Sequence, residues 1–152
     1  LYPPQSGIVF EIEEEPDLPR ISADPFQLRQ VLHNLIKNSQ EALAPSTQGK
    51  MCFLLRKTVA QGEAFVQLTV RDNGPGIPKD QADRIFEPYV TTKTKGTGLG
   101  MATVKKIVDE HGGAIEVQSD EGQGTTVVLT VPDGATRGRE DTTDRVKALE
   151  AP

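Results

Sequence analysis

The spacing of apolar residues changes repeatedly along residues 7–131, from every second residue to every third or fourth. The first spacing is typical of β-strands and the second of α-helices. A chain that alternates between the two is expected to fold as an α/β domain, in which helices pack against a sheet. With 152 residues, the chain is long enough for one domain with a substantial core.

Two helices are predicted. The first begins with Asp24 as its N-cap, has proline in its first position, and is expected to end near Pro45. Its apolar positions are Phe26, Leu28, Val31, Leu32, Leu35, Ile36, Ala42 and Leu43. The second helix runs from about Gly98 to His111 and stops at Gly112, in the C′ position that favours glycine.

Five strands complete the predicted domain. One is expected at residues 7–13, and two hairpins pair 51–59 with 64–71 and 114–119 with 125–131. Their turns are expected at Gln61-Gly62-Glu63 and around Glu121-Gly122-Gln123-Gly124. The residues from Asp133 onward are almost all polar and are predicted to form a disordered tail.

Composition excludes several classes of function. The 17 basic side chains are outnumbered by 22 acidic ones, and a net charge of −5 argues against binding to nucleic acid or anionic lipid. Cys52 is the single cysteine, so neither a disulfide framework nor a Cys/His metal cluster is expected. We interpret it as a core thiol in a reducing compartment, the cytoplasm. No apolar run approaches the roughly 18 residues that a transmembrane helix needs, and the initial Leu indicates a fragment or a processed form.

The sequence 96-GTGLG-100 opens the second predicted helix with three glycines in five residues. It matches neither the GxGxxG of a dinucleotide fold nor a phosphate-binding loop of the Walker type. Exposed backbone N–H groups and the helix dipole would still suit phosphate oxygens. The alternative is a flexible loop whose glycines permit tight packing.

The sequence 72-DNGPGIP-78 follows a predicted strand directly. Asp72 at the strand end could accept a hydrogen bond from an exocyclic amine, while Gly74 and Gly76 would let a flat heterocycle approach the backbone. These properties suit an adenine pocket. The alternative is an ordinary Asp-Asn-Gly turn.

Two amides lie one turn apart on the first predicted helix. Asn34 and Asn38 belong to a polar stripe, with Gln27 and Glu41, that runs beside the apolar arc. Mg²⁺ bound to a nucleotide takes one or two protein oxygens, and an amide carbonyl can supply one. Equally, both amides could only tie the helix to neighbouring backbone.

Five motifs, in order, closely resemble the N, G1, F, G2 and final glycine boxes of sensor histidine kinases. They are QLRQVLHNLIKNSQEA, DNGPGIP, IFEPYVTTK, GTGLGMATVKKIVDEHGG and EGQGTT. The resemblance runs from about Ile8 to Pro132 and is strongest with the nitrogen-regulation class of these two-component kinases. It implies a catalytic ATP-binding domain at 1–132 followed by the tail at 133–152. The implied fold is the two-layer α/β sandwich of the Bergerat type, with a mixed, mostly antiparallel sheet and helices on one face.

The resemblance also implies site residues. Asp72 would receive the adenine amine, with Gly74, Gly76 and Ile77 shaping the pocket and Thr125 at the same edge. Asn38 would bind Mg²⁺, with Asn34 near the triphosphate. A lid from about Lys79 to Gly96, anchored by Phe86, would cover the nucleotide. The groups expected to meet the phosphates are Lys93, Lys95, Gly96, Thr97, Gly98, Leu99 and Gly100.

Two departures from the family pattern bear on function. Many relatives carry a basic residue three positions after the metal-binding Asn, where this chain has Glu41, so a phosphate contact from that position is in doubt. The phosphoacceptor His motif is also absent. His33 is expected on the outward face of the first helix, and His111 at a helix end as a terminal cation or a partly buried contact.

The implied function is therefore divided between domains. This chain would bind MgATP and donate the γ-phosphate to a histidine on a separate helical dimerisation domain of the same parent, for signalling to a response regulator. The fragment is expected to be monomeric and its parent a homodimer, with membrane anchoring of the parent left open. The alternatives are a serine kinase or self-sufficient ATPase of the same fold, and a nucleotide-sensing module without phosphotransfer.

Overall fold

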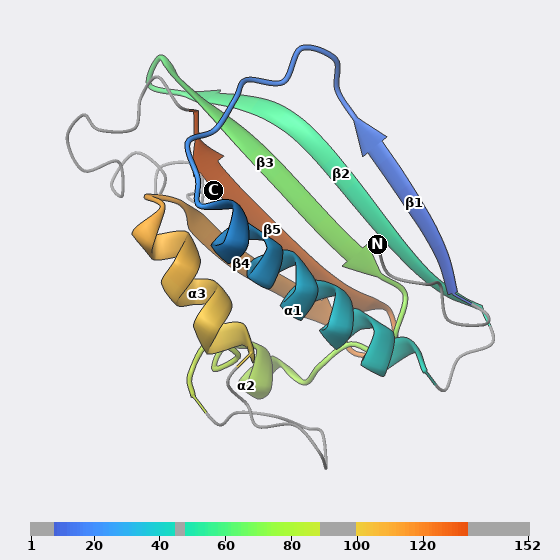
Figure 1. The fold of residues 1–152 in the computed structure, drawn as a ribbon. Helices are drawn as coiled ribbons and strands as arrows, with labels where there is room; N and C mark the ends of the chain where they lie inside the picture. Colours follow the sequence, from blue (N-terminus) through green and yellow to red (C-terminus); the bar gives the residue numbers. More distant parts are fainter. Residues whose placement is uncertain (1–7, 45–47, 89–99, 134–152) are drawn as a thin grey trace.

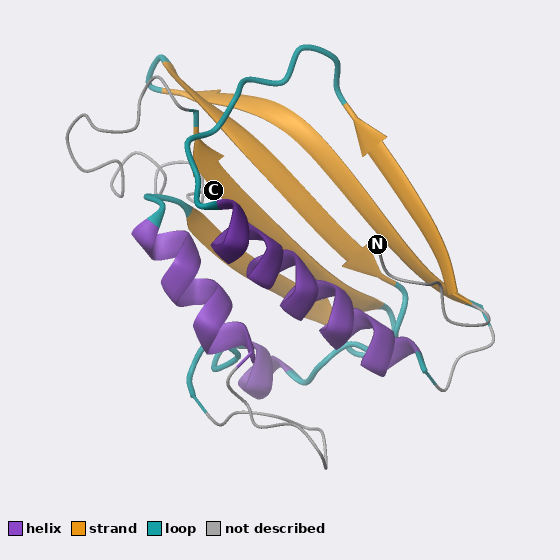
Figure 2. Cartoon of the chain, viewed as in Figure 1, coloured by secondary structure: helices purple, strands orange, loops and turns teal. Residues whose placement is uncertain are grey.

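The computed structural model describes residues 8–44, 48–88 and 100–133. Within these ranges one mixed sheet of five strands has the order β1-β2-β3-β5-β4. Helices α1 and α3 lie side by side on one face of the sheet, giving two layers (Figures 1 and 2). The elements in chain order are β1 Ile8–Glu14, α1 Pro25–Leu43, β2 Gly49–Ala60, β3 Glu63–Asp72, α2 Lys79–Ala82, α3 Gly100–Glu110, β4 Ala114–Asp120 and β5 Gly124–Pro132.

The pairing of the strands agrees with the predicted hairpins and refines one turn. Strands β2 and β3 are antiparallel, as are β3 with β5 and β4 with β5, whereas β1 runs parallel to β2. The predicted turn at Gln61–Glu63 is shorter than expected, because Glu63 already pairs with Ala60. Gln61 and Gly62 have φ angles of 52° and 77°, and positive φ at both central residues is typical of a two-residue type I′ turn.

Helix α1 begins as its sequence predicts. The Asp24 carboxylate accepts hydrogen bonds from the backbone N–H groups of Phe26 at 2.9 Å and Gln27 at 3.4 Å, which satisfies two of the amides left free at a helix start. Phe26 itself does not join the core, since its side chain is 79% exposed. It lies five residues before the buried Val31 and therefore about 140° away around the helix.

Helix α3 ends in a glycine cap at the predicted residue. Gly112 has a φ of 70°, and its N–H donates to the carbonyl of Asp109 at 3.0 Å. The N–H of Gly113 donates to the carbonyl of Val108 at 3.0 Å. These two bonds form a Schellman motif, which ends the helix and turns the chain into β4.

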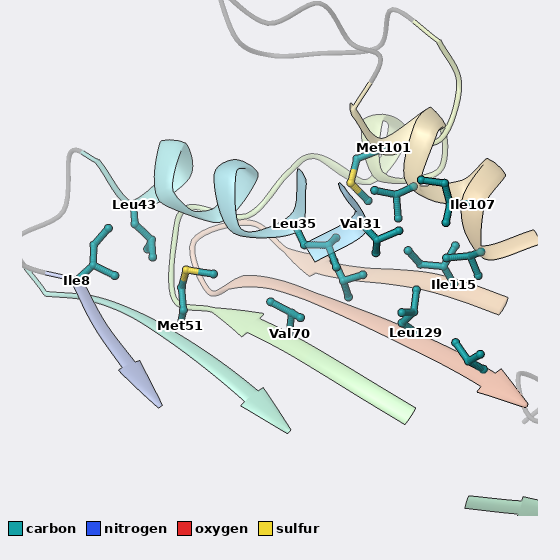
Figure 3. Close-up of a cluster of buried hydrophobic side chains, with 14 residues drawn as sticks. Ile8, Val31, Leu35, Leu43, Met51, Val70, Met101, Ile107, Ile115 and Leu129 are labelled. Atoms are coloured by element: carbon teal, nitrogen blue, oxygen red, sulfur yellow. The ribbon is translucent and has the colours of Figure 1, made fainter. Parts of the chain in front are cut away.

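The core fills the space between the helices and the sheet (Figure 3). The buried side chains of α1 and α3 meet those on the facing side of the strands, and the residues labelled in Figure 3 are Ile8, Val31, Leu35, Leu43, Met51, Val70, Met101, Ile107, Ile115 and Leu129. None of the helices in the described ranges is long and apolar enough to span a membrane. The predicted tail, beyond Asp133, lies outside the described residues.

The prediction that Cys52 is a core thiol is wrong. Its side chain is only partly buried, and its Sγ lies 3.6 Å from a carboxylate oxygen of Glu11. Neighbouring Met51 is completely buried under the helices, so the alternation of side chains along a strand directs Cys52 to the opposite face of the sheet. An apolar run such as MCFLL does not reveal which of its residues face the core.

Candidate functional site

The candidate site lies at one end of the sheet, where β3 ends and β5 begins. Asp72 is the last residue of β3 and pairs with Thr125 of β5. Its side chain shares the face of the sheet that α1 and α3 cover, and only 6% of the residue is exposed. A buried carboxylate needs hydrogen-bond donors to offset its lost hydration, so its partners define the site.

Three donors hold the Asp72 carboxylate. The Ser39 hydroxyl on α1 donates to Oδ2 at 2.9 Å, and the contact is buried. The backbone N–H of Gly74 donates to Oδ1 at 3.0 Å, and that of Thr125 donates to the same oxygen at 3.3 Å. The carboxylate is thus fixed by neutral groups from a helix, a loop and a strand.

The loop after β3 is held from both sides. The Asn73 side chain accepts from the N–H of Lys50 at 2.7 Å and donates to the carbonyl of Gln48 at 2.9 Å. On the other side, the N–H of Gly122 donates to the carbonyl of Pro75 at 2.6 Å. The Asp-Asn-Gly segment therefore forms a turn at Asn73, and the loop beside Asp72 is held in place by these hydrogen bonds.

Two glycines let backbone segments approach closely around Asp72. A Cβ atom on Gly76 would lie 2.4 Å from the carbonyl oxygen of Asp120. A Cβ atom on Gly124 would lie 2.0 Å from the carbonyl oxygen of Asp72 itself. Any larger residue at either position would push the loop or the β4–β5 hairpin away from the end of β3.

Ser119 of β4 connects three parts of the site. Its hydroxyl oxygen accepts from the N–H of Ile77 at 2.8 Å and donates to the carbonyl of Gly124 at 3.2 Å. The hydroxyl of Thr125 lies 3.2 Å from the same oxygen. Ile77 and Thr125, both predicted site residues, thus share Ser119 as a hydrogen-bond partner, and Thr125 also contacts Asp72.

The first of the two predicted amides of α1, Asn34, contacts the start of α3. The Asn34 Nδ2 donates to the carbonyl of Gly100 at 3.3 Å, so this amide does tie its helix to neighbouring backbone. Asn38, one turn further on, is half-buried, as are Asn34 and Gln27. Glu41 is exposed. The structure thus places Asn34 against the N-terminal end of α3, with Asn38 one helical turn further along α1. Lys93, Lys95, Gly96, Thr97, Gly98 and Leu99 lie outside the described residues.

The first part of the predicted lid contains structure that the sequence did not predict. Residues Lys79–Ala82 form the single-turn helix α2. Ile85 and Phe86 pack against the core, as expected for Phe86. Arg84 forms an exposed ion pair with Glu87 at 2.7 Å, and the hydrogen bond and charge of that carboxylate raise the pKa of Arg84. Apolar contacts therefore hold this stretch, and the exposed ion pair adds little.

The two histidines lie in different environments. His33 is exposed on α1, as predicted. His111 is 6% exposed; its Nε2 accepts from the N–H of Asp24 at 3.1 Å and its Nδ1 lies 2.8 Å from the carbonyl of Ile107. Of the two roles predicted for His111, the structure supports a buried contact and not a helix-terminal cation.

Asp72 lines neither of two hollows found in the described part of the chain. An open hollow lies along the β1–β2 edge, where Ile8, Glu11 and Lys50 line it. A cavity of about 10 Å³ lies beside His111 among apolar side chains. The candidate site is therefore identified by its hydrogen bonds and by the convergence of five elements.

Three site residues escaped the sequence analysis: Ser39, Ser119 and Asn73. Ser39 carried a usable signal, because it occupies the fourth-residue spacing of the buried Val31, Leu35 and Leu43. A polar side chain in a buried series requires a hydrogen-bond partner. Ser119 carried no comparable signal, since its partners come from residues 77, 124 and 125 and meet only in the folded sheet.

Comparison with known sequences gives a consistent result. A family model described as "Histidine kinase-, DNA gyrase B-, and HSP90-like ATPase" matches residues 23–135. Sensor histidine kinase ZraS of Escherichia coli strain K12 is 46% identical over 120 residues, which cover 79% of this chain and 24% of that protein. Sensory histidine kinase/phosphatase NtrB of Rhizobium leguminosarum bv. phaseoli is 40% identical over 125 residues, covering 76% and 33%. The chain thus spans about a quarter to a third of these curated relatives.

Solved structures agree with the sequence comparison. The catalytic domain of histidine kinase ThkA is 35% identical, with a TM-score of 0.72, covering 85% of this chain and 81% of that one. Full-length ShkA in complex with AMPPNP is 32% identical, with a TM-score of 0.70 and coverage of 85% and 26%. ThkA in complex with response regulator protein TrrA is 29% identical, with a TM-score of 0.67 and coverage of 86% and 35%. The predicted α/β sandwich is confirmed.

Proposed function

Because the chain belongs to the histidine kinase-, DNA gyrase B- and HSP90-like ATPase family, we propose that it binds MgATP and donates the γ-phosphate to a histidine on a separate helical domain. Within that family it is a histidine kinase catalytic domain, as is the ThkA domain that it matches. Residues 1–132 would form this domain, and 133–152 a polar tail.

The observation that carries the proposal is the Asp72 carboxylate. It is buried, and three neutral donors orient it. An ionised carboxylate can accept about four hydrogen bonds, so one position is left for a donor from a ligand. The exocyclic amine of adenine is such a donor, and Gly74, Gly76, Ile77 and Thr125 would surround the base.

The triphosphate would extend from this pocket toward α3. Asn34 and Gly100 are in contact there, and the N-terminal end of an eleven-residue helix attracts anions through its free N–H groups and dipole. The glycine run at 96–100 leads into this end. Lys93 and Lys95 precede it along the chain and would neutralise phosphate charge as the lid from Lys79 to Gly96 closes.

Asn38 would supply the protein oxygen to Mg²⁺. It lies one turn after Asn34 on α1 and is half-buried; an amide carbonyl is one of the oxygen ligands that Mg²⁺ accepts. In the described ranges no group of three or more His, Cys, Asp or Glu side chains could hold a metal. When bound, the ion would neutralise charge on the phosphates, while the protein positions the nucleotide.

The partners of the proposed reaction lie outside this domain. The acceptor histidine would belong to a helical dimerisation domain of the parent protein, and a response regulator would take the phosphoryl group next. The complex of ThkA with TrrA supports the second partner. We propose a monomeric domain in the cytoplasm and a homodimeric parent.

Asn38→Ala tests the metal role within this function. We expect it to remove most of the gain in ATP affinity that Mg²⁺ produces, while binding without metal changes much less. Asn34→Ala is the matched control on the same helix, with a smaller metal-dependent loss. Equal losses with and without Mg²⁺ for Asn38→Ala would instead assign it a structural role.

Phosphate release by the isolated chain separates this function from a self-sufficient ATPase. A catalytic domain that needs an acceptor histidine should bind ATP and release inorganic phosphate very slowly on its own. Rapid release, abolished by Asp72→Asn, would favour the ATPase. Transfer of labelled phosphate to an added helical domain would exclude a purely sensing module.

A further inference from the structure

We infer that Ser39 and Ser119 are positioning residues that make the base-binding edge of this site a hydrogen-bond acceptor at both Asp72 and Thr125. The edge would then select a purine with a 6-amino group and reject one with a 6-oxo group. The inference rests on the proposed nucleotide function. It assigns roles to two serines that bond Asp72 and Thr125, the residues expected to touch the base.

The first step concerns the Asp72 carboxylate. Its Oδ1 accepts from two backbone N–H groups, those of Gly74 and Thr125. With two lone pairs on each oxygen, Oδ1 has no position left. Any further donor must therefore bind Oδ2.

The second step concerns Ser39. Its hydroxyl donates to Oδ2 at 2.9 Å from within the buried face of α1. This bond occupies one of the two positions on Oδ2 and prevents the carboxylate from turning about its own axis. One acceptor position on Oδ2 is left, and its direction is set by the Ser39 hydroxyl.

The third step concerns Ser119 and the proton of Thr125. The Ile77 N–H can only donate to the Ser119 oxygen, and the Gly124 carbonyl can only accept its hydrogen. Ser119 has then used its one proton, so the contact with the Thr125 hydroxyl at 3.2 Å requires Thr125 to be the donor. The Thr125 oxygen is consequently left with lone pairs only.

Together these bonds determine which base fits. Asp72 Oδ2 and the Thr125 oxygen can only accept, and Asp72 and Thr125 are directly paired across β3 and β5. A 6-amino group brings two N–H donors to these two oxygens. A 6-oxo group brings only lone pairs, which would face the lone pairs of Asp72 and Thr125. Leaving a buried polar group unpaired is what makes such a site selective.

The test compares three triphosphates by calorimetry: ATP, inosine triphosphate and purine riboside triphosphate, which lacks any 6-substituent. The wild-type chain should bind ATP at least about tenfold more tightly than either of the others, a difference of about 1.4 kcal/mol. Ser39→Ala and Ser119→Ala should each reduce this preference severalfold. Both variants should lower the affinity for ATP but change the affinity for purine riboside triphosphate by less than a factor of about two, since only the hydrogen bond to the 6-amino group is lost.

Two further variants make the result specific. Ser39→Cys keeps the shape of the side chain with a weak donor and should give an intermediate preference. Ser22→Ala, at an exposed serine in the connection before α1, should leave the preference unchanged. Thermal unfolding is followed in parallel, and if Ser39→Ala does not fold, Ser39→Cys and Ser119→Ala carry the test.

The outcomes distinguish this inference from the function on which it rests. If both serine variants lower the affinities for ATP and for purine riboside triphosphate equally, the serines have a packing role and the inference is overturned. A wild-type chain that binds ATP and inosine triphosphate equally would also overturn it, although the proposed function would stand. A wild-type chain that binds no ATP would overturn both.

Discussion

The backbone N–H of Asp24, the N-cap of α1, donates to Nε2 of His111 at the end of α3, with 3.1 Å between the nitrogens. The carbonyl of Ile107, 2.8 Å from Nδ1, can only accept, so the imidazole carries its proton on Nδ1 and is neutral. At the other end of the pair, Asn34 donates to the carbonyl of Gly100. Side-chain hydrogen bonds thus fix α3 against α1 at both of its ends.

Replacing His111 should therefore destabilise the domain. His111→Ala removes the acceptor of the Asp24 N–H in a part-buried contact and enlarges the small cavity beside the ring. We therefore expect a loss of about 2–4 kcal/mol in the free energy of unfolding. Urea denaturation measures it. The control is His33→Ala on the exposed face of α1, with an expected change within about 0.5 kcal/mol. Similar values for both variants would contradict this role of the imidazole.

Gly124 and Gly122 form a matched pair in one hairpin. Both have positive φ, at 112° and 81°, but only a Cβ on Gly124 would meet backbone, 2.0 Å from the Asp72 carbonyl oxygen, whereas one on Gly122 would meet nothing within 4 Å. Gly122→Ala should cost only the roughly 1–2 kcal/mol of a left-handed conformation. Gly124→Ala should lower the free energy of unfolding by clearly more. It should also lower the affinity for ATP, because the added methyl group separates β5 from Asp72. If thermal unfolding shows the same loss of stability for both variants, the close approach of Gly124 to the Asp72 carbonyl is contradicted.

Much of the fold could be predicted because local signals agree with one another. The Asp24 cap, the Gly112 stop and the hairpins were each indicated by a few neighbouring residues, and the structure confirms them. Where burial depends on the whole sheet, local patterns misled: Cys52 faces away from the helices, and Phe26 points away from the core. The single-turn helix α2 has no periodicity long enough to detect.

Less of the candidate site than of the fold could be predicted from the sequence. Asp72 was singled out because it ends a predicted strand and is followed by two spaced glycines. The groups that hold it could not be predicted, since Ser39 and Thr125 are 33 and 53 residues away from it in sequence. Their roles follow from strand register and helix placement, which only the folded structure supplies.

Cys52 offers a test of the electrostatics on the opposite face of the sheet. Burial and then the neighbouring Glu11 carboxylate raise the pKa of the Cys52 thiol. Only the thiolate reacts with iodoacetamide, so Glu11→Gln should lower that pKa and speed alkylation at pH 7–8. Glu110→Gln, at the exposed end of α3, is the control and should leave the rate unchanged. An unchanged rate in Glu11→Gln would exclude the carboxylate as a cause of the shift.

Phe86 should limit the motion of the segment that follows α2. Its side chain packs against the core together with Ile85, so Phe86→Ala should raise the rate of trypsin cleavage after Lys79 and Arg84, with or without nucleotide. A non-hydrolysable ATP analogue with Mg²⁺ should slow cleavage after these residues and after Lys93 and Lys95 more than ADP does. Cleavage that is equally fast with and without the analogue would contradict a lid that closes on the γ-phosphate.

The most direct test of the account is the affinity of the chain for MgATP with and without the Asp72 carboxylate. In Asp72→Asn one carboxylate oxygen becomes an NH2 group, which can donate but cannot accept. Either the N–H groups of Gly74 and Thr125 lose their acceptor at Oδ1, or Ser39 and the adenine amine lose theirs at Oδ2. Calorimetry should therefore show a loss of about 1.5–3 kcal/mol in binding free energy, the value for a hydrogen bond to a charged group. Asp83→Asn, at an exposed carboxylate after α2, should bind like the wild type. If Asp72→Asn remains folded by thermal unfolding and binds MgATP with unchanged affinity, Asp72 does not hold the adenine and the proposed site is wrong.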